Sequence, residues 1–387
     1  MSLKDRVLEC MQKAVDNHEC AGLSLQVRVD GKVALDAEAG YADIAGQRPI
    51  QHNSIFRLYS QSKPVTAAAA MLLMERGVID LADPVEKFLP GFHGQKVWTK
   101  DGLVPVNRPV QVLDLLGMTA GLCYPDADEP AQYAAKLFME NQELIRAGGG
   151  MSTVEFANRM GELPLAFQPG EQFRYSTCAD VLGAVIEVAS GKPFADFLRE
   201  EFFEPLGMRD TGFWVPEEKR DRFVTCYRRV PGGLEPFHEL HLAVGDYSRQ
   251  PAFASGGAGL VSTLDDYAAF ADMLMNEGLY KGRRILQAAT VRYMTKPQLT
   301  ERASRTYWDS LSGFSYGKLM RIAVHPGQCS YLISENEYGW DGWLGTYFAN
   351  LPKERLTFLL MQNATDTGTA AVTRKLRNIV YAGLSEL

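Results

Sequence analysis

Ser60 and Lys63 lie three positions apart in the segment Ser-Gln-Ser-Lys, and an apolar run from Pro64 to Met74 follows them. Residues i and i+3 share one face of a helix, so Lys63 can bring its amine to the Ser60 hydroxyl while Ser62 points elsewhere. A serine hydroxyl needs a neighbouring base to act as a nucleophile, and lysine is a base only when burial or a nearby charge lowers its pKa. The pattern therefore predicts a nucleophile with its base, although a polar cap on a buried helix fits the same residues.

The spacing recurs at Ser315 and Lys318, within the glycine-flanked stretch LSGFSYGKLM. That stretch has no helix-opening pattern, and a helix is what brings the two side chains together. We therefore expect the second copy to be a chance match.

A second motif, Tyr175-Ser-Thr177, follows a proline-glycine turn and directly precedes an amphipathic segment over residues 177–191. A tyrosine beside an ammonium group can give up or share its proton, so Tyr175 can serve first as a base and later as an acid. A buried tyrosine whose hydroxyl is hydrogen-bonded for structural reasons fits the same position.

A third motif, Trp340-Asp-Gly342-Trp343, is predicted to begin a late strand. Glycine lets a substrate lie against the strand edge, and the backbone N–H that follows it can face an oxyanion. A glycine at this position can equally mark a β-bulge.

In chain order the three motifs resemble those of the serine β-lactamase and penicillin-binding-protein superfamily, most closely its class C and family VIII carboxylesterase branch. Three further segments match the same superfamily, namely residues 115–122, 204–213 and 256–270, and the likeness covers roughly residues 20–364. The resemblance implies that Ser60 is acylated, that Lys63 and Tyr175 handle its proton, and that the N–H groups of Ser60 and Trp343 form an oxyanion hole. Which of Lys63 and Tyr175 is the base stays open, because the pair would share its titration.

Two positions depart from the superfamily pattern. Class C enzymes usually have Tyr-x-Asn in the second motif, whereas Thr177 replaces the amide that would hold a substrate carbonyl. Their third motif usually begins with a cationic or histidine residue, whereas Trp340 stands there. An indole favours an uncharged acyl or alcohol group, so we expect short-chain esters to be better substrates than β-lactams, unless another cation such as Arg321 approaches the site.

The elements around these motifs predict an α+β fold. An N-terminal helix is followed by two strands around the turn Asp30-Gly31, helices are predicted over residues 60–87, 110–122 and 177–191, and two strands and a helix from about Thr369 end the chain. Strands at both ends imply one antiparallel sheet built from both termini, flanked by helices, with a helical domain inserted beside it. We expect one β-lactamase-like catalytic domain over residues 1–387, with sub-domains of about 1–85 plus 250–387 and about 86–249.

Composition narrows the function classes. The formal net charge is −7, and no basic patch favours nucleic acid or an anionic membrane surface. The six cysteines show no metal-ligand spacing, and His238 and His241 lack the H-E-x-x-H pattern, so no metal or other cofactor is expected. The N-terminus lacks a secretory signal and no apolar run could span a membrane, which favours a cytoplasmic protein. The expected partner is a small-molecule substrate, and the oligomeric state stays open.

The leading hypothesis is a serine hydrolase that acts through an acyl-enzyme on small esters or amides. A β-lactamase, a D-amino-acid peptidase and an acyltransferase are alternatives with the same nucleophile. A different class is a catalytically weak protein that binds a peptidoglycan-like ligand, but such a protein has no need of the complete set Ser60, Lys63 and Tyr175.

Overall fold

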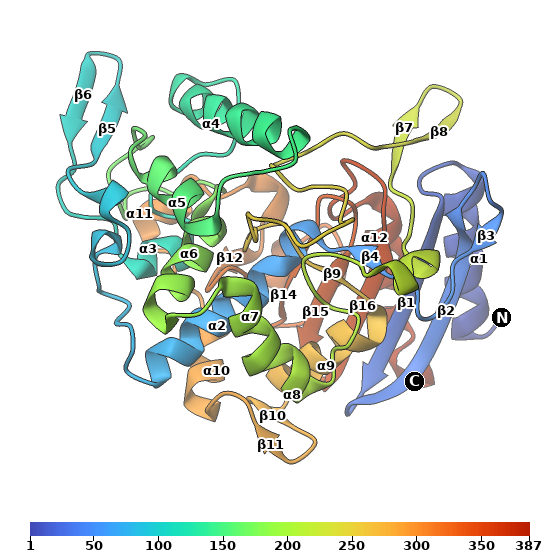
Figure 1. Ribbon diagram of the computed structural model, residues 1–387. Coiled ribbons are helices and arrows are strands. Elements are labelled where there is room, and N and C mark those ends of the chain that lie inside the picture. Colours follow the sequence, from blue (N-terminus) through green and yellow to red (C-terminus); the bar gives the residue numbers. More distant parts are fainter.

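The computed structural model describes residues 1–387, and its main sheet joins the two ends of the chain. Eight strands pair in the order β12-β13-β14-β15-β16-β1-β2-β3, and all the neighbours are antiparallel. Their bounds are β1 Gly22–Val29, β2 Lys32–Asp43, β3 Arg48–Pro49, β12 Phe314–Tyr316, β13 Arg321–Ala323, β14 Tyr338–Asp341, β15 Tyr347–Leu351 and β16 Leu356–Gln362. In Figure 1 the blue strands β1 and β2 lie beside the red strand β16, with both termini at that end of the molecule.

The predicted hairpin at Asp30-Gly31 is present and fixes the register of the first two strands. Both residues have positive φ, 49° for Asp30 and 72° for Gly31, as a tight hairpin turn requires. Leu25 of β1 then pairs with Ala37 of β2 on one side and Leu360 of β16 on the other. The predicted α+β class, with an antiparallel sheet formed by both termini, is confirmed.

Twelve α-helices accompany the sheet. Their bounds are α1 Leu3–Asp16, α2 Lys63–Glu75, α3 Val112–Gly117, α4 Glu129–Arg146, α5 Thr153–Gly161, α6 Cys178–Ser190, α7 Phe194–Leu198, α8 Glu204–Leu206, α9 Leu264–Met275, α10 Ala288–Met294, α11 Glu301–Ser304 and α12 Ala371–Ala382. The remaining strands form four two-stranded pairs: β4 Phe56–Arg57 with β9 Val261–Ser262, β5 Lys96–Thr99 with β6 Gly102–Pro105, β7 Tyr227–Val230 with β8 Gly233–Pro236, and β10 Leu279–Tyr280 with β11 Arg283–Arg284.

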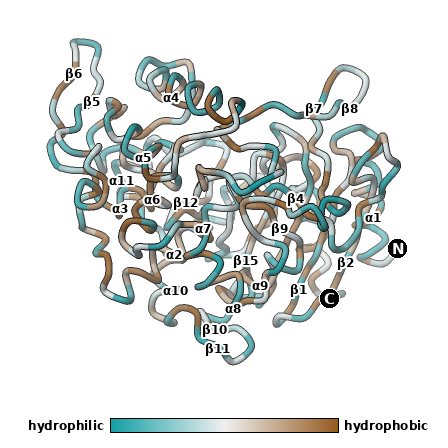
Figure 2. Tube along the Cα trace, viewed as in Figure 1, coloured by the Kyte–Doolittle hydropathy of each residue, from teal (hydrophilic) through white to brown (hydrophobic).

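The sheet separates two hydrophobic cores, because successive side chains of a strand point to opposite faces. On one face α1 and α12 pack on β1, β15 and β16 through residues such as Met11, Leu25 and Leu376. The larger core lies on the other face, where α9 packs on the sheet through Tyr267 and Phe348, and it continues through α2 into the helices beyond. Figure 2 shows brown, apolar segments gathered in this interior around α2 and α6.

Two predicted helices are shorter than expected. The helical pattern over residues 60–87 gives an α-helix only from Lys63 to Glu75, and Gly77 follows it with a φ of 69°. The helix predicted over residues 110–122 covers only Val112–Gly117, because Met118 takes a left-handed conformation with φ 56° and ends it.

The strands of the main sheet all fall outside residues 86–249, and helices α3 to α8 all fall inside them. One core of 77 buried residues nevertheless runs through both parts. The proposed division into sub-domains therefore stays a prediction. None of the helices is long and apolar enough to cross a membrane.

Candidate active site

Ser60 lies in a short 3₁₀ turn, Tyr59–Ser62, and Lys63 is the first residue of α2. Side chains three residues apart eclipse each other in a 3₁₀ turn, and the Lys63 Nζ accordingly lies 3.0 Å from the Ser60 Oγ. Tyr59, immediately before the serine, has a φ of 46°, an unfavourable conformation for a residue with a Cβ. The backbone is therefore bent sharply at the point where it presents the Ser60 hydroxyl.

Lys63 is fully buried and has no carboxylate within hydrogen-bond distance. Its Nζ lies 2.9 Å from the Gly257 carbonyl and 3.2 Å from the Tyr124 hydroxyl, in addition to Ser60. Burial lowers the pKa of Lys63 to about 7, and the nearby Asp180 charge opposes part of that fall. A neutral amine can donate to Gly257 and Tyr124, which leaves its lone pair for the proton of Ser60.

Tyr175 completes the cluster from the loop that precedes α6. Its hydroxyl accepts a hydrogen bond from the Trp340 Nε1 at 3.0 Å, and Tyr175 lines the same cavity as Ser60. Its ring lies 4.5 Å from the Lys63 Nζ. Burial raises the pKa of Tyr175 well above its usual range, so the phenol keeps its proton near neutral pH. These opposite shifts favour Lys63 over Tyr175 as the base.

Sequence reasoning missed two residues that support Lys63. Tyr124 lies between Lys63 and Asp180, with its hydroxyl 3.5 Å from the Asp180 Oδ2. Asp180 is buried in α6 and accepts hydrogen bonds from the Ser255 hydroxyl and the Gly257 N–H, and burial raises the pKa of its carboxyl. The sequence did carry a signal for Asp180. It stands within the largely apolar helix CADVLGAVIEVA, and an acidic residue is rarely buried without partners.

The third motif ends a strand, so the prediction that it begins one is wrong. Strand β14 stops at Asp341, and the chain turns at Gly342, whose N–H donates to the Thr346 carbonyl. A Cβ on Gly342 would lie 2.2 Å from the Leu58 carbonyl oxygen. Glycine is thus needed for the close approach of β14 to the backbone just before Ser60, since any side chain would push the two apart.

Contacts of its side chain hold Trp343 beside the turn that carries Ser60. Its ring stacks on His241 with centroids 3.9 Å apart, lies 5.1 Å from the Tyr59 ring, and donates its Nε1 hydrogen to Asp366 at 2.8 Å. Burial lowers the pKa of His241 to about 4, so this imidazole is neutral near pH 7. The Trp343 backbone N–H has no hydrogen-bond partner in the protein.

Three other residues that the sequence brought into question lie outside the cluster of Ser60, Lys63 and Tyr175. The Thr177 hydroxyl is buried against the Cys123 carbonyl at 3.4 Å, so the structure does not bring this residue to the cavity beside Ser60. The hydroxyl of Ser62 accepts a hydrogen bond from the Leu260 N–H and is turned away from Lys63. The Arg321 Nη1 is bonded to the Asp341 Oδ1 at 3.0 Å and its side chain is 1% exposed, so this arginine offers no free cation.

The second serine–lysine pair forms no comparable cluster. Ser315 lies in β12, opposite Ile322 of β13. Lys318 instead places its Nζ 3.9 Å from the centre of the Tyr293 ring, and no hydrogen bond joins it to Ser315. The expectation that this copy is a chance match agrees with that geometry.

The Ser60 hydroxyl opens into a cavity of about 360 Å³. Its walls include Tyr175, Trp340, Gly342 and Trp343, which the sequence had singled out. Trp308 lines it too, with its ring stacked at 6.5 Å and 18° on Trp340, and sequence reasoning did not find it. The cavity is therefore largely aromatic beside Ser60.

The β-lactamase family model matches residues 7–382, so the chain belongs to the β-lactamase family. The chain is similar to Protein Rv1367c of Mycobacterium tuberculosis, with 31% identity over 365 residues that cover 90% of this chain and 87% of that one. It is also similar to Esterase EstB of Burkholderia gladioli, with 28% identity over 401 residues, 98% of this chain and 96% of the other.

Among solved structures it resembles EstCE1, described as a hydrolase with promiscuous acyltransferase activity. The TM-score is 0.83 with 26% identity, and the likeness covers 98% of each chain. The family and the fold thus define a hydrolase of the serine β-lactamase superfamily.

Proposed function

We propose that this protein is a carboxylesterase-like serine hydrolase that cleaves small esters, and more slowly amides, through an acyl-enzyme on Ser60. The observation that carries the proposal is the 3.0 Å contact of the Ser60 Oγ with a buried lysine whose pKa falls to about 7. A lysine at its usual pKa would be protonated at neutral pH and could not accept the serine proton. The similarity to Esterase EstB supports the same reaction class.

In the proposed first step the Ser60 Oγ attacks the carbonyl carbon of the ester while its proton passes to the Lys63 amine. The bond from the carbonyl carbon to the alcohol oxygen then breaks, and the leaving alcohol takes a proton from the Lys63–Tyr175 pair. Water attacks the acyl-enzyme with the same pair as its base, which releases the acid and restores Ser60.

We assign the oxyanion hole to the N–H groups of Ser60 and Trp343. The Trp343 N–H has no partner within the protein, and the approach of Gly342 to Leu58 holds that peptide next to the nucleophile. A preorganised donor of this kind stabilises the tetrahedral intermediate more than it stabilises the ester.

The cavity supports esters over β-lactams. Trp340 is buried and hydrogen-bonded to Tyr175, so an aromatic surface occupies the place where a cation would meet a carboxylate next to the scissile bond. Thr177 does not replace the missing amide, because its hydroxyl is engaged with Cys123. β-Lactamase and D-amino-acid peptidase activities are therefore secondary candidates.

Acyl transfer to an alcohol is the second function that an observation favours. EstCE1 is described as having promiscuous acyltransferase activity, and the aromatic walls formed by Trp308, Trp340 and Trp343 suit an organic alcohol as well as water. Product analysis with added 1-butanol separates the two outcomes, since transfer yields a butyl ester and hydrolysis yields a free acid.

The proposal is tested by covalent labelling followed by substrate comparison. A fluorophosphonate probe should add to the wild type and to Ser315→Ala, and Ser60→Ala should show no mass increase. For the wild type, kcat/KM for 4-nitrophenyl butanoate should exceed that for a chromogenic cephalosporin. Labelling that survives in Ser60→Ala contradicts the assignment of the nucleophile, and a preference for the cephalosporin contradicts the substrate class.

The same labelling distinguishes an enzyme from a binding protein. A protein that only binds a peptidoglycan-like ligand has no need of an activated serine and would react with the probe no faster than denatured protein does. We expect rapid labelling, because the buried Lys63 amine removes the Ser60 proton.

A further inference from the structure

His241 contacts the ring of Trp343 but does not line the cavity that holds Ser60. The imidazole and the indole lie 3.9 Å apart at an angle of 21°, which is a stacked arrangement. The Tyr59 ring completes a triangle, at 5.1 Å from Trp343 and 5.6 Å from His241. One ring of this triangle therefore belongs to the residue before Ser60, and another belongs to the residue whose N–H we assign to the oxyanion hole.

Ring contact, and not a hydrogen bond from Nδ1, joins His241 to its neighbours. The Nδ1 atom is buried and has no hydrogen-bond partner in the protein. Burial lowers the pKa of the imidazole to about 4, so the ring is neutral near pH 7. A flat, neutral ring of this kind packs well against an indole, because aromatic pairs favour offset stacking.

The turn that follows His241 is strained. Leu242 and Ala243 both have a positive φ, 52° and 56°, which is unfavourable for residues with a Cβ. The Val244 N–H donates to the His241 carbonyl at 3.1 Å and closes the turn. Strained backbone of this kind persists only where the surrounding structure maintains it, and it is common at functional sites.

Every polar group of Trp343 except its backbone N–H has a partner in the protein. The Nε1 donates to Asp366, and the carbonyl accepts from the Thr367 N–H at 3.1 Å and the Gly368 N–H at 3.4 Å. This loop holds the edge of the indole and the carbonyl, whereas His241 covers the face of the ring. A rotation of the peptide before Trp343 would carry the indole off the imidazole, so the stack fixes the direction of the free N–H.

We propose that His241 is a positioning residue for the oxyanion hole, which holds the Trp343 N–H towards the oxyanion by stacking on the Trp343 ring. The inference rests on the proposed acyl-enzyme mechanism and adds a residue to it. In the tetrahedral intermediate the Ser60 Oγ has bonded to the carbonyl carbon, the electron pair of the carbonyl lies on its oxygen, and the serine proton has passed to Lys63. A donor aimed at that oxygen stabilises the intermediate more than the ester, so displacing it lowers kcat without raising KM.

Steady-state kinetics with 4-nitrophenyl butanoate test this role. His241→Ala should lower kcat by about 10- to 100-fold and leave KM within about threefold, because a misplacement of about 1 Å costs up to about 10²-fold. His241→Phe keeps a flat ring without nitrogen atoms and should keep most of the wild-type kcat. His238→Ala is the matched control, since this exposed histidine of the same segment lines a different cavity, beside α4. An unchanged kcat in His241→Ala, or an equal loss in His241→Phe or His238→Ala, overturns the inference.

A transition-state analogue separates positioning from a general loss of structure. A trifluoromethyl ketone is attacked by Ser60 and places its own oxyanion in the hole, whereas the methyl ketone of the same chain binds without that addition. In His241→Ala the Ki of the trifluoromethyl ketone should rise by about the factor by which kcat falls, with the Ki of the methyl ketone unchanged. An equal rise in both Ki values overturns the inference. If His241→Ala does not fold, His241→Leu takes its place, because leucine fills the space without a flat ring.

A spectroscopic measurement separates this inference from the fate of the proposed function. The five tryptophans are labelled with ¹⁵N, and the backbone N–H signal of Trp343 is assigned with Trp343→Phe. This signal should shift or broaden in His241→Ala and stay near its wild-type position in His241→Phe and His238→Ala. That result supports the positioning role even if the wild type turns over no ester. Ester turnover by the wild type with an unchanged signal in His241→Ala overturns the positioning role and leaves the esterase standing.

Discussion

The pKa of Lys63 is set by the groups that surround its amine. An isolated lysine is protonated far above neutral pH, but this one has lost its water and gained only the neutral Gly257 carbonyl and two hydroxyls as neighbours. The negative charge of Asp180 acts across Tyr124 and offsets only part of the desolvation. In the proposed mechanism Lys63 is therefore the base near pH 7 and Tyr175 stays a hydrogen-bond donor.

The lowered pKa of Lys63 and the raised pKa of Tyr175 together predict the pH dependence of the reaction. The active form has neutral Lys63, whose pKa is about 7, so kcat/KM for a neutral ester should rise about tenfold per unit below pH 6 and level off above pH 8. At lower pH the Lys63 amine is protonated and can no longer accept the Ser60 proton, so activity falls as the pH is lowered. Because burial raises the pKa of Tyr175 well above its usual range, no second fall is expected up to pH 9.

Two variants check the origin of that profile. Lys63→Arg should be inactive at every pH, because a guanidinium stays protonated. Lys318→Arg changes the other buried lysine, whose pKa is lowered by burial to about 8, and should leave the midpoint where it is. A profile that is flat between pH 5.5 and 8, or a midpoint that moves in Lys318→Arg, would show that Lys63 is not the titrating base.

At the scale of elements, the site depends on how closely β14 approaches the turn that carries Ser60. Two backbone segments meet there, and Gly342 and Leu58 are in contact without a side chain between them. The Thr346 hydroxyl donates to the same Leu58 carbonyl at 3.0 Å, which ties the loop after β14 to the residue before Tyr59. The proposed oxyanion donor, the Trp343 N–H, and the proposed nucleophile, Ser60, are therefore positioned by one contact between elements that are far apart in the sequence.

Gly342→Ala should disrupt this contact. The added Cβ would lie 2.2 Å from the Leu58 carbonyl oxygen and 2.4 Å from the Thr346 Oγ1, so the strand end has to move. We expect a loss of about 1–3 kcal/mol in the free energy of unfolding, as for other overpacked sites, and a fall of about 100-fold in kcat/KM from the displaced oxyanion donor. Urea denaturation and ester kinetics measure the two effects.

Gly327→Ala is the matched control for that substitution. A Cβ at Gly327 meets nothing within 4 Å, and the residue does not have a positive φ. It should change stability and activity only slightly. If Gly342→Ala keeps full activity, the close approach is not what positions the oxyanion hole.

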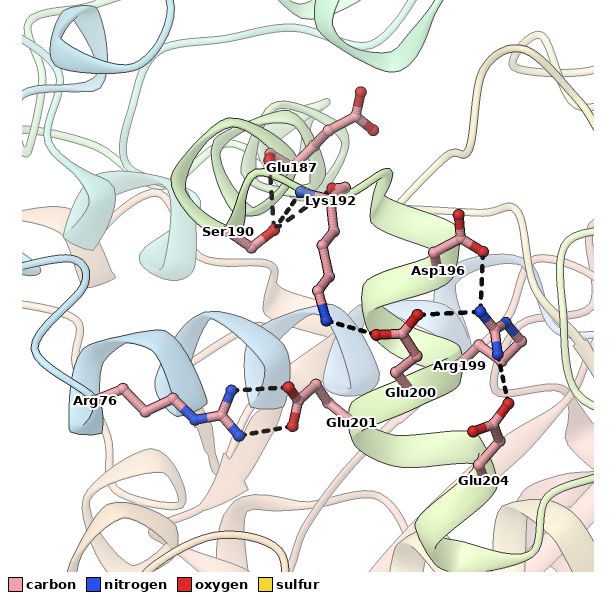
Figure 3. Close-up of polar contacts among 9 residues, drawn as sticks. All are labelled: Arg76, Glu187, Ser190, Lys192, Asp196, Arg199, Glu200, Glu201 and Glu204. Carbon is pink, nitrogen blue, oxygen red and sulfur yellow. Dashed lines mark hydrogen bonds and ion pairs between the residues drawn. The ribbon is translucent and has the colours of Figure 1, made fainter.

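At the scale of the whole molecule, two kinds of charge pairing hold the elements together. Arg377 of α12 is paired with Glu337, just before β14, where both side chains are at most 1% exposed, and the Tyr381 hydroxyl donates to the same carboxylate. Figure 3 shows the other kind, a surface network in which Arg76 at the end of α2 meets Glu201, and Lys192 and Arg199 meet Glu200. Arg76 and Glu201 are 44% and 24% exposed.

Burial decides how much each pairing contributes to stability. Glu337→Ala leaves the Arg377 charge buried without a partner and should lower the free energy of unfolding by about 3–5 kcal/mol. Arg76→Ala removes a solvated pair and should cost less than about 1 kcal/mol, with a smaller effect at high salt. Urea denaturation of both variants at low and high salt tests this, and an equal loss in the two would contradict it.

The sequence alone determined the local features. The i, i+3 spacing of Ser60 and Lys63, the apolar run behind them and the Asp30-Gly31 turn each depend on neighbouring residues, and the structure has all three. Strands at both ends of the chain were enough to predict the antiparallel sheet, because edges of strands must find partners. The order of the three motifs was enough to indicate the superfamily.

Contacts between distant residues were decided only by the tertiary structure. The pKa of Lys63 is lowered by burial and partly restored by the charge of Asp180, and its hydrogen-bond partners Gly257 and Tyr124 also come from other segments. The turn after β14, the removal of Thr177 from the cavity and the neutralisation of Arg321 by Asp341 likewise depend on packing across the sheet and the helices. Local spacing can place a serine beside a lysine, but the loss of water and the pairing of charges that set their reactivity come from residues that only folding brings near.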